Sequence, residues 1–154
     1  MANEGSTGRR WRVYRNTGTY AVPVWTAVTE RKDIGLPMTK DEIESLRDGA
    51  EFKEYLKGYK DLSFETEIKY TRANANHVAL RTDFMADDDG YFDLLVLDGA
   101  SDDSGAQGMR LIVALFDFSH TGPLTDETLV SLVFKPTYAE DTGTPIVSEW
   151  YTVS

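Results

Sequence analysis

The chain has 154 residues, of which 41% are hydrophobic, with no cysteine and a formal net charge of −10. This length fits one domain with its own core, because a chain of about 150 residues can bury roughly 70% of its unfolded surface. The missing cysteines exclude disulfides and cysteine-ligated metal sites, and the hydrophobic content excludes a disordered chain. The acidic balance argues against adhesive nucleic-acid binding, in which lysine and arginine displace counterions from phosphate.

Residues 1–15 differ in charge from the rest of the chain. Four arginines, Arg9, Arg10, Arg12 and Arg15, stand against Glu4, so this segment carries +3 and the remainder −13. We predict an N-terminal arm over 1–15 that lies on the acidic surface of a neighbouring molecule, with a solvated tail as the alternative. The segment lacks the apolar core of a secretory signal, and no apolar run is long enough to cross a bilayer. We therefore expect a cytoplasmic protein without membrane insertion.

Six stretches rich in β-branched and aromatic residues predict strands, in chain order at 20–34, 62–70, 91–97, 110–119, 129–134 and 145–153. The stretch 62–70 alternates, so Phe64 and Ile68 face a core while Glu65 and Glu67 face solvent. The stretches 91–97, 110–119 and 129–134 are mostly apolar on both faces. That pattern is typical of strands covered by a second layer or by another subunit.

Two stretches have helical patterns. Asn76 can cap a helix that runs to about Ala86, where consecutive aspartates and Gly90 end it. Thr39 to Glu42 matches a capping box, so propensity predicts a second helix over 40–57, interrupted at Gly49. A strand over 42–48 is the alternative. Many strand candidates with few helices predict a β-sandwich or a barrel.

No arrangement of residues indicates catalysis. His77 and His120 lie in no metal-binding or nucleophile spacing and are interpreted as structural or surface residues. Carboxylate pairs for glycoside hydrolysis could be drawn from 26 acidic residues in many ways, so they carry no weight without a cleft. Two aspartate groups could hold calcium, although turn formation is the commoner use of aspartate beside glycine: Asp87, Asp88, Asp89 and Asp93, or Asp98, Asp102 and Asp103.

The order of short motifs along residues 16–136 resembles that of the major tail tube proteins of long-tailed bacteriophages and phage-derived gene transfer agents. The motifs that carry this resemblance are Gly18-Thr19-Tyr20, Pro23 to Val28, Asp33 to Leu36, Glu42-Ile43-Glu44, Arg47-Asp48-Gly49, Tyr55 to Asp61, the alternating strand Leu62 to Tyr70, a single helix, Leu97-Asp98-Gly99, Gly108 to Phe118 and Leu132 to Pro136.

The resemblance implies a mainly β protein, a β-sandwich or barrel with one flanking helix over 16–154. Six subunits would form a ring, and stacked rings would form a tube that conducts duplex DNA. It also implies a strand at 42–48 and an extended loop at 47–60 that packs on a neighbouring subunit or ring. The side chains implied at that contact are Phe52, Tyr55, Leu56 and Tyr59.

An acidic channel would repel phosphate and keep DNA mobile. Glu65 and Glu67 are our first choice for the residues that line this channel, and Glu42 and Glu44 are our second choice. The alternative is that these glutamates lie on the outer surface. The arginines of the arm would contact the next ring. The expected partners are tape-measure, distal-tail and terminator proteins of a virion or particle tail assembled in the host cytoplasm, with no cofactor, metal or catalytic activity. The alternative is a β-sandwich module that binds carbohydrate or calcium on a tail tip or capsid surface.

Overall fold

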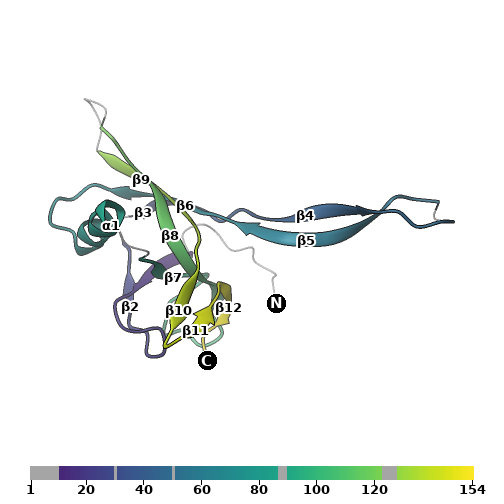
Figure 1. Cartoon of the computed structure of the whole chain (residues 1–154). Coiled ribbons are helices and arrows are strands. Elements are labelled where there is room, and N and C mark those ends of the chain that lie inside the picture. The colour runs from purple at the N-terminus through teal and green to yellow at the C-terminus, as the bar shows by residue number, and fades with distance from the viewer. Residues whose placement is uncertain (1–10, 30, 50, 87–89, 123–127) are drawn as a thin grey trace, which may run out of the picture.

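The computed structural model describes residues 11–29, 31–49, 51–86, 90–122 and 128–154, with the backbone alone of Asp33 (Figure 1). The described part of the chain is mainly β and has one helix. Its elements are β1 Arg12–Asn16, β2 Trp25–Ala27, β3 Arg31–Gly35, β4 Met38–Ser45, β5 Glu54–Leu62, β6 Phe64–Lys69, α1 Ala75–Met85, β7 Phe92–Leu97, β8 Gln107–Thr121, β9 Leu129–Pro136, β10 Ala139–Asp141, β11 Thr144–Ile146 and β12 Glu149–Thr152.

Eight strands form one antiparallel sheet in the order β2-β1-β7-β8-β9-β6-β3, with β12 also paired to β8. The long strand β8 organises this sheet. Its residues 108–113 pair with β7, whereas residues 113–121 pair with β9 on its other edge. Side chains from both halves, among them Val96 of β7 and Phe134 of β9, share one core cluster. The structure therefore has one large sheet with a shared core cluster, where a sandwich would have two separate sheets.

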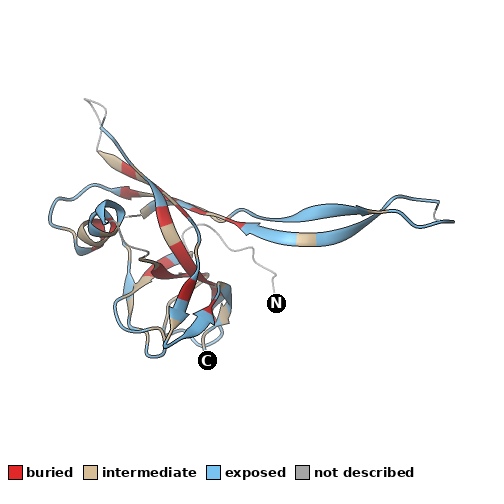
Figure 2. Ribbon diagram, in the orientation of Figure 1, coloured by how far each residue is buried: buried red, intermediate tan, exposed pale blue. Residues whose placement is uncertain are grey.

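Strand β7 is buried along its whole length, as the apolar pattern of 91–97 predicts (Figure 2). Leu94 and Val96 belong to the main core, while Leu95 and Leu97 pack with Tyr14 in a second cluster on the opposite face. Each face of β7 therefore has its own apolar neighbours. The alternation predicted for 62–70 is also confirmed, because Phe64, Thr66 and Ile68 are buried on one face of β6.

The helix predicted at 76–86 is confirmed as α1, which lies against β8. Its N-cap is Asn74, so the prediction of Asn76 as the cap is wrong. Asn74 has an extended backbone, and its side chain accepts hydrogen bonds from the backbone N–H groups of Asn76 and His77. Asn76 is already inside the first turn and is buried.

The helix predicted over 40–57 is wrong, because these residues form the antiparallel hairpin β4–β5. Cross-strand pairs replace the helical contacts: Ile43 lies opposite Leu56, and Glu42 lies opposite Lys57. The strand implied at 42–48 corresponds to β4, whereas the loop implied at 47–60 is largely strand β5. The hairpin projects from the body and is exposed along most of its length (Figures 1 and 2).

The predicted arm is shorter than residues 1–15, because β1 begins at Arg12 and pairs with both β2 and β7. Val13 and Tyr14 are buried in this strand. Burying these two side chains fixes the segment in the sheet, so the domain starts before residue 16. At the other end of the chain, β12 pairs with β8 within the stretch 145–153, where a strand was predicted. The helix that the structure describes is too short and polar to span a membrane.

Candidate assembly surfaces and acidic face

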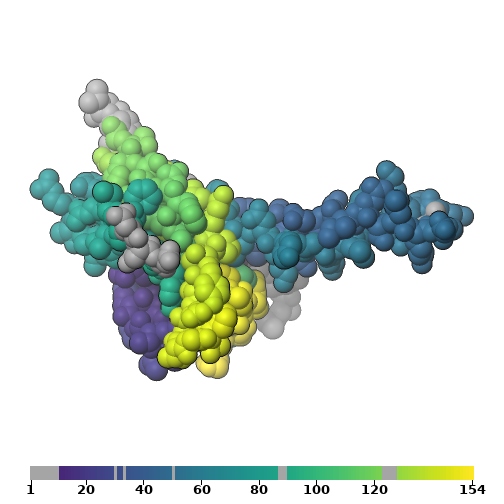
Figure 3. Space-filling model, viewed as in Figure 1, coloured from purple at the N-terminus to yellow at the C-terminus, as the bar shows by residue number. Residues whose placement is uncertain are grey.

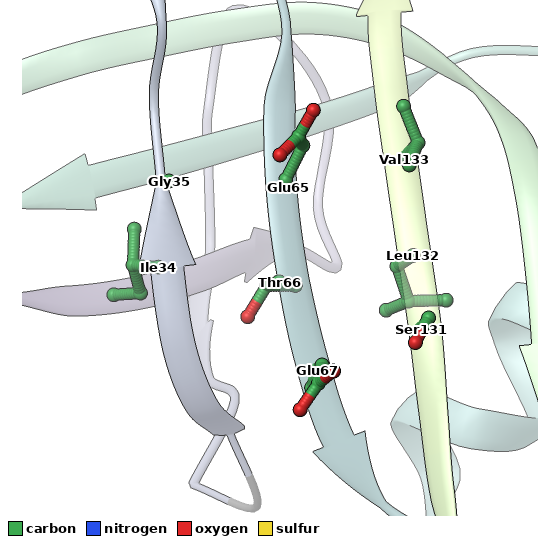
Figure 4. A pocket seen from close by; sticks show the side chains of 8 residues that line it. All are labelled: Ile34, Gly35, Glu65, Thr66, Glu67, Ser131, Leu132 and Val133. Carbon is green, nitrogen blue, oxygen red and sulfur yellow. The ribbon is translucent and has the colours of Figure 1, made fainter. Parts of the chain in front are cut away.

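Glu65 and Glu67 project from the side of β6 that faces away from the core. Glu65 lies between Gly35 of β3 and Val133 of β9, and Glu67 lies opposite Ser131 (Figure 4). These residues, with Ile34, Thr66 and Leu132, line an open groove of about 380 Å³. Since glycine and serine add little height, the two carboxylates rise above their cross-strand neighbours, and Lys69 follows Glu67 on the same face of β6. Among the described residues, no cation lies within ion-pair distance of either carboxylate.

Glu42 and Glu44 lie elsewhere, on β4 of the projecting hairpin. Glu42 is paired across the hairpin with Lys57, and a Glu44 oxygen lies 4.0 Å from Lys53 Nζ. Each of these two glutamates thus has a lysine next to it on the hairpin, but only Glu44 lies within ion-pair distance. Glu42 and Glu44 therefore lie on a different surface from Glu65 and Glu67, the residues that we expect first to line the channel.

The hairpin exposes the side chains predicted to form a subunit contact. Phe52 is 82% exposed and Tyr59 is 89% exposed, and Tyr55 and Leu56 are also exposed. Figure 3 shows the hairpin, in blue and teal, extending beyond the rest of the chain. Such a concentration of large apolar side chains in water is unusual for a free surface.

Two further apolar residues of the hairpin, Ile43 and Leu46, are exposed and were missed as contact residues. Both residues fall within the helix that propensity predicted over 40–57. The pairing of Ile43 with Leu56 instead places two apolar side chains together on one face of the hairpin. The alternative of a strand at 42–48 contained the signal that could have found them.

A groove of about 860 Å³ lies at the root of the hairpin and also escaped the sequence analysis. Its walls come from β4, β5 and β8 and from the C-terminal segment. Tyr138, Val147 and Trp150 line it and are each more than half exposed. Exposed apolar side chains therefore also lie on the body of the molecule, at the root of the hairpin.

The four arginines assigned to the arm do not form one group. Arg9 and Arg10 lie outside the described residues, whereas Arg12 and Arg15 belong to β1. Arg15 Nε donates to Asn76 Oδ1 at 3.1 Å, and partial burial lowers the pKa of Arg15. The assignment of Arg15 to a free arm is wrong, because its guanidinium connects β1 to α1.

Asp93, a candidate calcium ligand in the sequence, instead forms a buried ion pair with Arg110. Arg110 Nη2 lies 2.6 Å from Asp93 Oδ2, and its guanidinium lies over the ring of Tyr20. Burial alone would lower the pKa of Arg110, but the hydrogen bond and charge of Asp93 raise it above its ordinary value. Asp87, Asp88 and Asp89 lie outside the described residues. Within the described part of the chain, no three acidic or histidine side chains gather as a metal site would require.

Comparison of the chain with protein-family models and with curated proteins found no match. Solved structures do match its fold. A chain in the tail of an empty gene transfer agent (GTA) particle with C6 symmetry has a TM-score of 0.64 and 10% identity, over 88% of this chain and 96% of that one. A chain in a native GTA virion has a TM-score of 0.64 and 11% identity, again over 88% of this chain and 96% of that one. A chain in the sixfold-symmetrised anti-feeding prophage baseplate has a TM-score of 0.67 and 9% identity, over 99% of both chains.

These likenesses define the class of fold. The chain has a phage tail-type fold, mainly β with one helix, which confirms the fold class that the resemblance implied. At 9–11% identity the likeness concerns the fold alone.

Proposed function

We propose that the chain is a structural subunit of a phage-type tail tube, without catalytic activity. Six copies would form a ring, and rings would stack into a tube located in the tail of a virion or phage-like particle. The sixfold symmetry of the particles that contain similar folds supports this number. Tape-measure, distal-tail and terminator proteins would be its neighbours in the tail.

The β4–β5 hairpin is the observation that carries this proposal. An isolated two-stranded hairpin is marginally stable in water, because neither face is covered. This hairpin nevertheless extends over 38–62 and exposes Leu46, Phe52 and Tyr59. Packing against a second copy would cover these side chains. A contact between two different surfaces of identical subunits repeats around a ring when the rotation closes.

The acidic face of β6 would line the channel. Repeated around a ring, Glu65 and Glu67 would present carboxylates that form no ion pair with a described cation. Such charges repel phosphate over a Debye length of about 8 Å at physiological ionic strength. Duplex DNA would then pass without adhering, because adhesion requires cations that release phosphate counterions. Glu42 and Glu44 are weaker candidates, since each has a lysine next to it on the projecting hairpin.

Electron microscopy of the concentrated purified protein tests this proposal. We expect sixfold rings or hollow tubes, with the hairpin of one subunit lying on another. Analytical ultracentrifugation that finds only monomers at high concentration would contradict it.

Calorimetry with calcium and with a glycan panel addresses the alternative of a binding module: a tube subunit gives no saturable heat, whereas a stoichiometric titration would favour the alternative.

A further inference from the structure

The only two histidines of the chain meet where α1 lies on β8. They are 43 residues apart in the sequence, and their Nε2 atoms are 3.2 Å apart. His77 is 2% exposed, whereas His120 is open to solvent. Aromatic rings surround the pair: Tyr70 lies edge-on to His77 at 4.8 Å, and Phe118 lies edge-on to His120 at 4.8 Å. The contact between α1 and β8 is therefore built around two titratable rings.

The hydrogen bond between the rings restricts where their protons can lie. One Nε2 atom must carry a proton and the other must be bare. His77 Nδ1 is buried and has no hydrogen-bond partner. A proton on that atom would be a buried donor without an acceptor, which is costly. We therefore assign the proton of His77 to Nε2, so that His77 donates to His120 Nε2.

Each proton that acid adds to the histidine pair disrupts this arrangement. A proton added to His120 places N–H groups on both facing nitrogens, unless His77 moves its own proton to the buried Nδ1. A second added proton places two positive charges at the 3.2 Å contact. The charged or titratable groups near His77 are Arg81 on its own helix, His120 from β8 and Tyr70 after β6. None of these described groups is a carboxylate, so none supplies a negative charge that would stabilise the added proton.

We propose that the His77–His120 pair is an acid-sensitive clasp that holds α1 on β8 only while both imidazoles are uncharged. Burial, the charge of His120 and the charge of Arg81 lower the pKa of His77, in agreement with this mechanism. The contribution of the clasp is complete above the unfolded-state pKa of about 6.5 and is lost as the pH falls below that value. Leu80 and the Arg15–Asn76 bond still hold α1, so acid loosens the helix without unfolding the sheet.

Hydrogen exchange of the full chain between pH 7.5 and 5.0, read by mass spectrometry, tests the clasp whether or not the chain assembles. Exchange at the ring C2 position reports the pKa of each histidine, and amide exchange reports the docking of α1. We expect His77 to titrate below its ordinary value. We also expect protection of α1 to fall by a larger factor than protection of β7, after correction for intrinsic rates. An ordinary pKa for His77, or equal loss in both elements, would overturn the proposal.

Two variants separate the clasp from a merely structural contact. His120→Gln supplies an acceptor that does not titrate, and His77→Phe fills the aromatic cluster without a titrating group. Both should keep α1 protected at pH 7.5 and reduce its loss of protection at pH 5.0. Arg81→Gln is the matched control: it leaves both rings in place, so the acid response should persist while the pKa of His77 rises. Full acid sensitivity in both histidine variants would also overturn the proposal.

Discussion

Arg110 and Asp93 form a buried, two-pronged ion pair that connects neighbouring strands β8 and β7. Arg110 Nε donates to Asp93 Oδ1 at 3.0 Å, and Nη2 donates to Oδ2 at 2.6 Å. Asn16 Nδ2 donates a further hydrogen bond to Asp93 Oδ2, and Arg110 also donates to the Tyr20 carbonyl. The pair thus joins the central strands to the segment that follows β1. Each charged group has several partners, which is the condition under which a buried pair is tolerated.

Replacement of Asp93 by alanine should therefore be strongly destabilising. It leaves the Arg110 guanidinium buried without its counter-charge, and loss of one partner of a buried pair costs about 3–5 kcal/mol. Urea denaturation at pH 7 measures this difference in unfolding free energy. Asp102→Ala, at an exposed aspartate, is the matched control and should change stability by less than about 0.5 kcal/mol. Equal effects of the two substitutions would mean that the buried pair is energetically unimportant.

Gly108 is required by the close approach of β8 to β7. A Cβ atom at this position would lie 1.7 Å from the carbonyl oxygen of Val96. Because the obstructing atom belongs to the backbone, Gly108→Ala must separate the strands, and we expect a loss beyond the roughly 1–3 kcal/mol of ordinary overpacking. Gly99→Ala is the control, since its Cβ would lie 3.3 Å or more from side-chain atoms. In thermal denaturation, the melting temperature of Gly108→Ala should be well below that of Gly99→Ala. The reverse order would show that the close approach of β8 to β7 does not require glycine at 108.

Asn74 should contribute measurably to the stability of α1. Its side-chain oxygen accepts from the N–H groups of Asn76 at 2.9 Å and His77 at 3.2 Å. Asn74→Ala removes both bonds and should cost about 1 kcal/mol, while Asn74→Ser keeps a capping oxygen and should cost less. Chemical denaturation compares the two variants. Equal stabilities would show that solvent replaces the cap without loss.

The features that the sequence predicted well are those with a local cause. The alternation around Phe64 and Ile68 marks β6 because each side chain meets the same core. The mostly apolar run 92–97 marks a strand buried on both faces. The helix α1 was found from its apolar spacing, although the capping residue lay two positions earlier than predicted.

The features that the sequence did not predict depend on distant partners. Ile43 and Leu46 are three residues apart, as on one helical face, yet Ile43 pairs with Leu56 in a hairpin. Helical spacing is decisive only when a core is present to receive the apolar face, and the hairpin projects away from the core. Likewise, nothing local to Arg15 or His120 indicates their bonds to α1, because these contacts span 61 and 43 residues.

The exposed aromatic residues of the hairpin should matter for assembly and not for folding. Phe52→Ser combined with Tyr59→Ser removes side chains that touch little within one subunit, so unfolding free energy should change by about 0.5 kcal/mol or less per site. In an interface each buried aromatic side chain would contribute about 1.5–3 kcal/mol, so rings or tubes should be lost.

Val22→Ser provides a matched control for the hairpin variants, because Val22 is an exposed apolar residue outside the hairpin. Electron microscopy and ultracentrifugation should find normal assembly for this control. A folded Phe52→Ser, Tyr59→Ser double variant that still assembles would remove these residues from the proposed interface. Loss of folding in the double variant would show that they act within one subunit.

Charge at Glu65 and Glu67 should control passage of DNA through an assembled tube. Glutamine at both positions removes the repulsion, and lysine at both adds attraction to phosphate, so delivery should slow in that order and depend on ionic strength. Glu42→Gln with Glu44→Gln is the matched control, because it makes the same change of net charge on the projecting hairpin instead of on β6. Tube number is counted by electron microscopy and DNA delivery by transfer into host cells. If lysine at 65 and 67 preserves both tubes and delivery, the acidic face of β6 lies outside the channel; if only the control slows delivery, the hairpin glutamates line it instead.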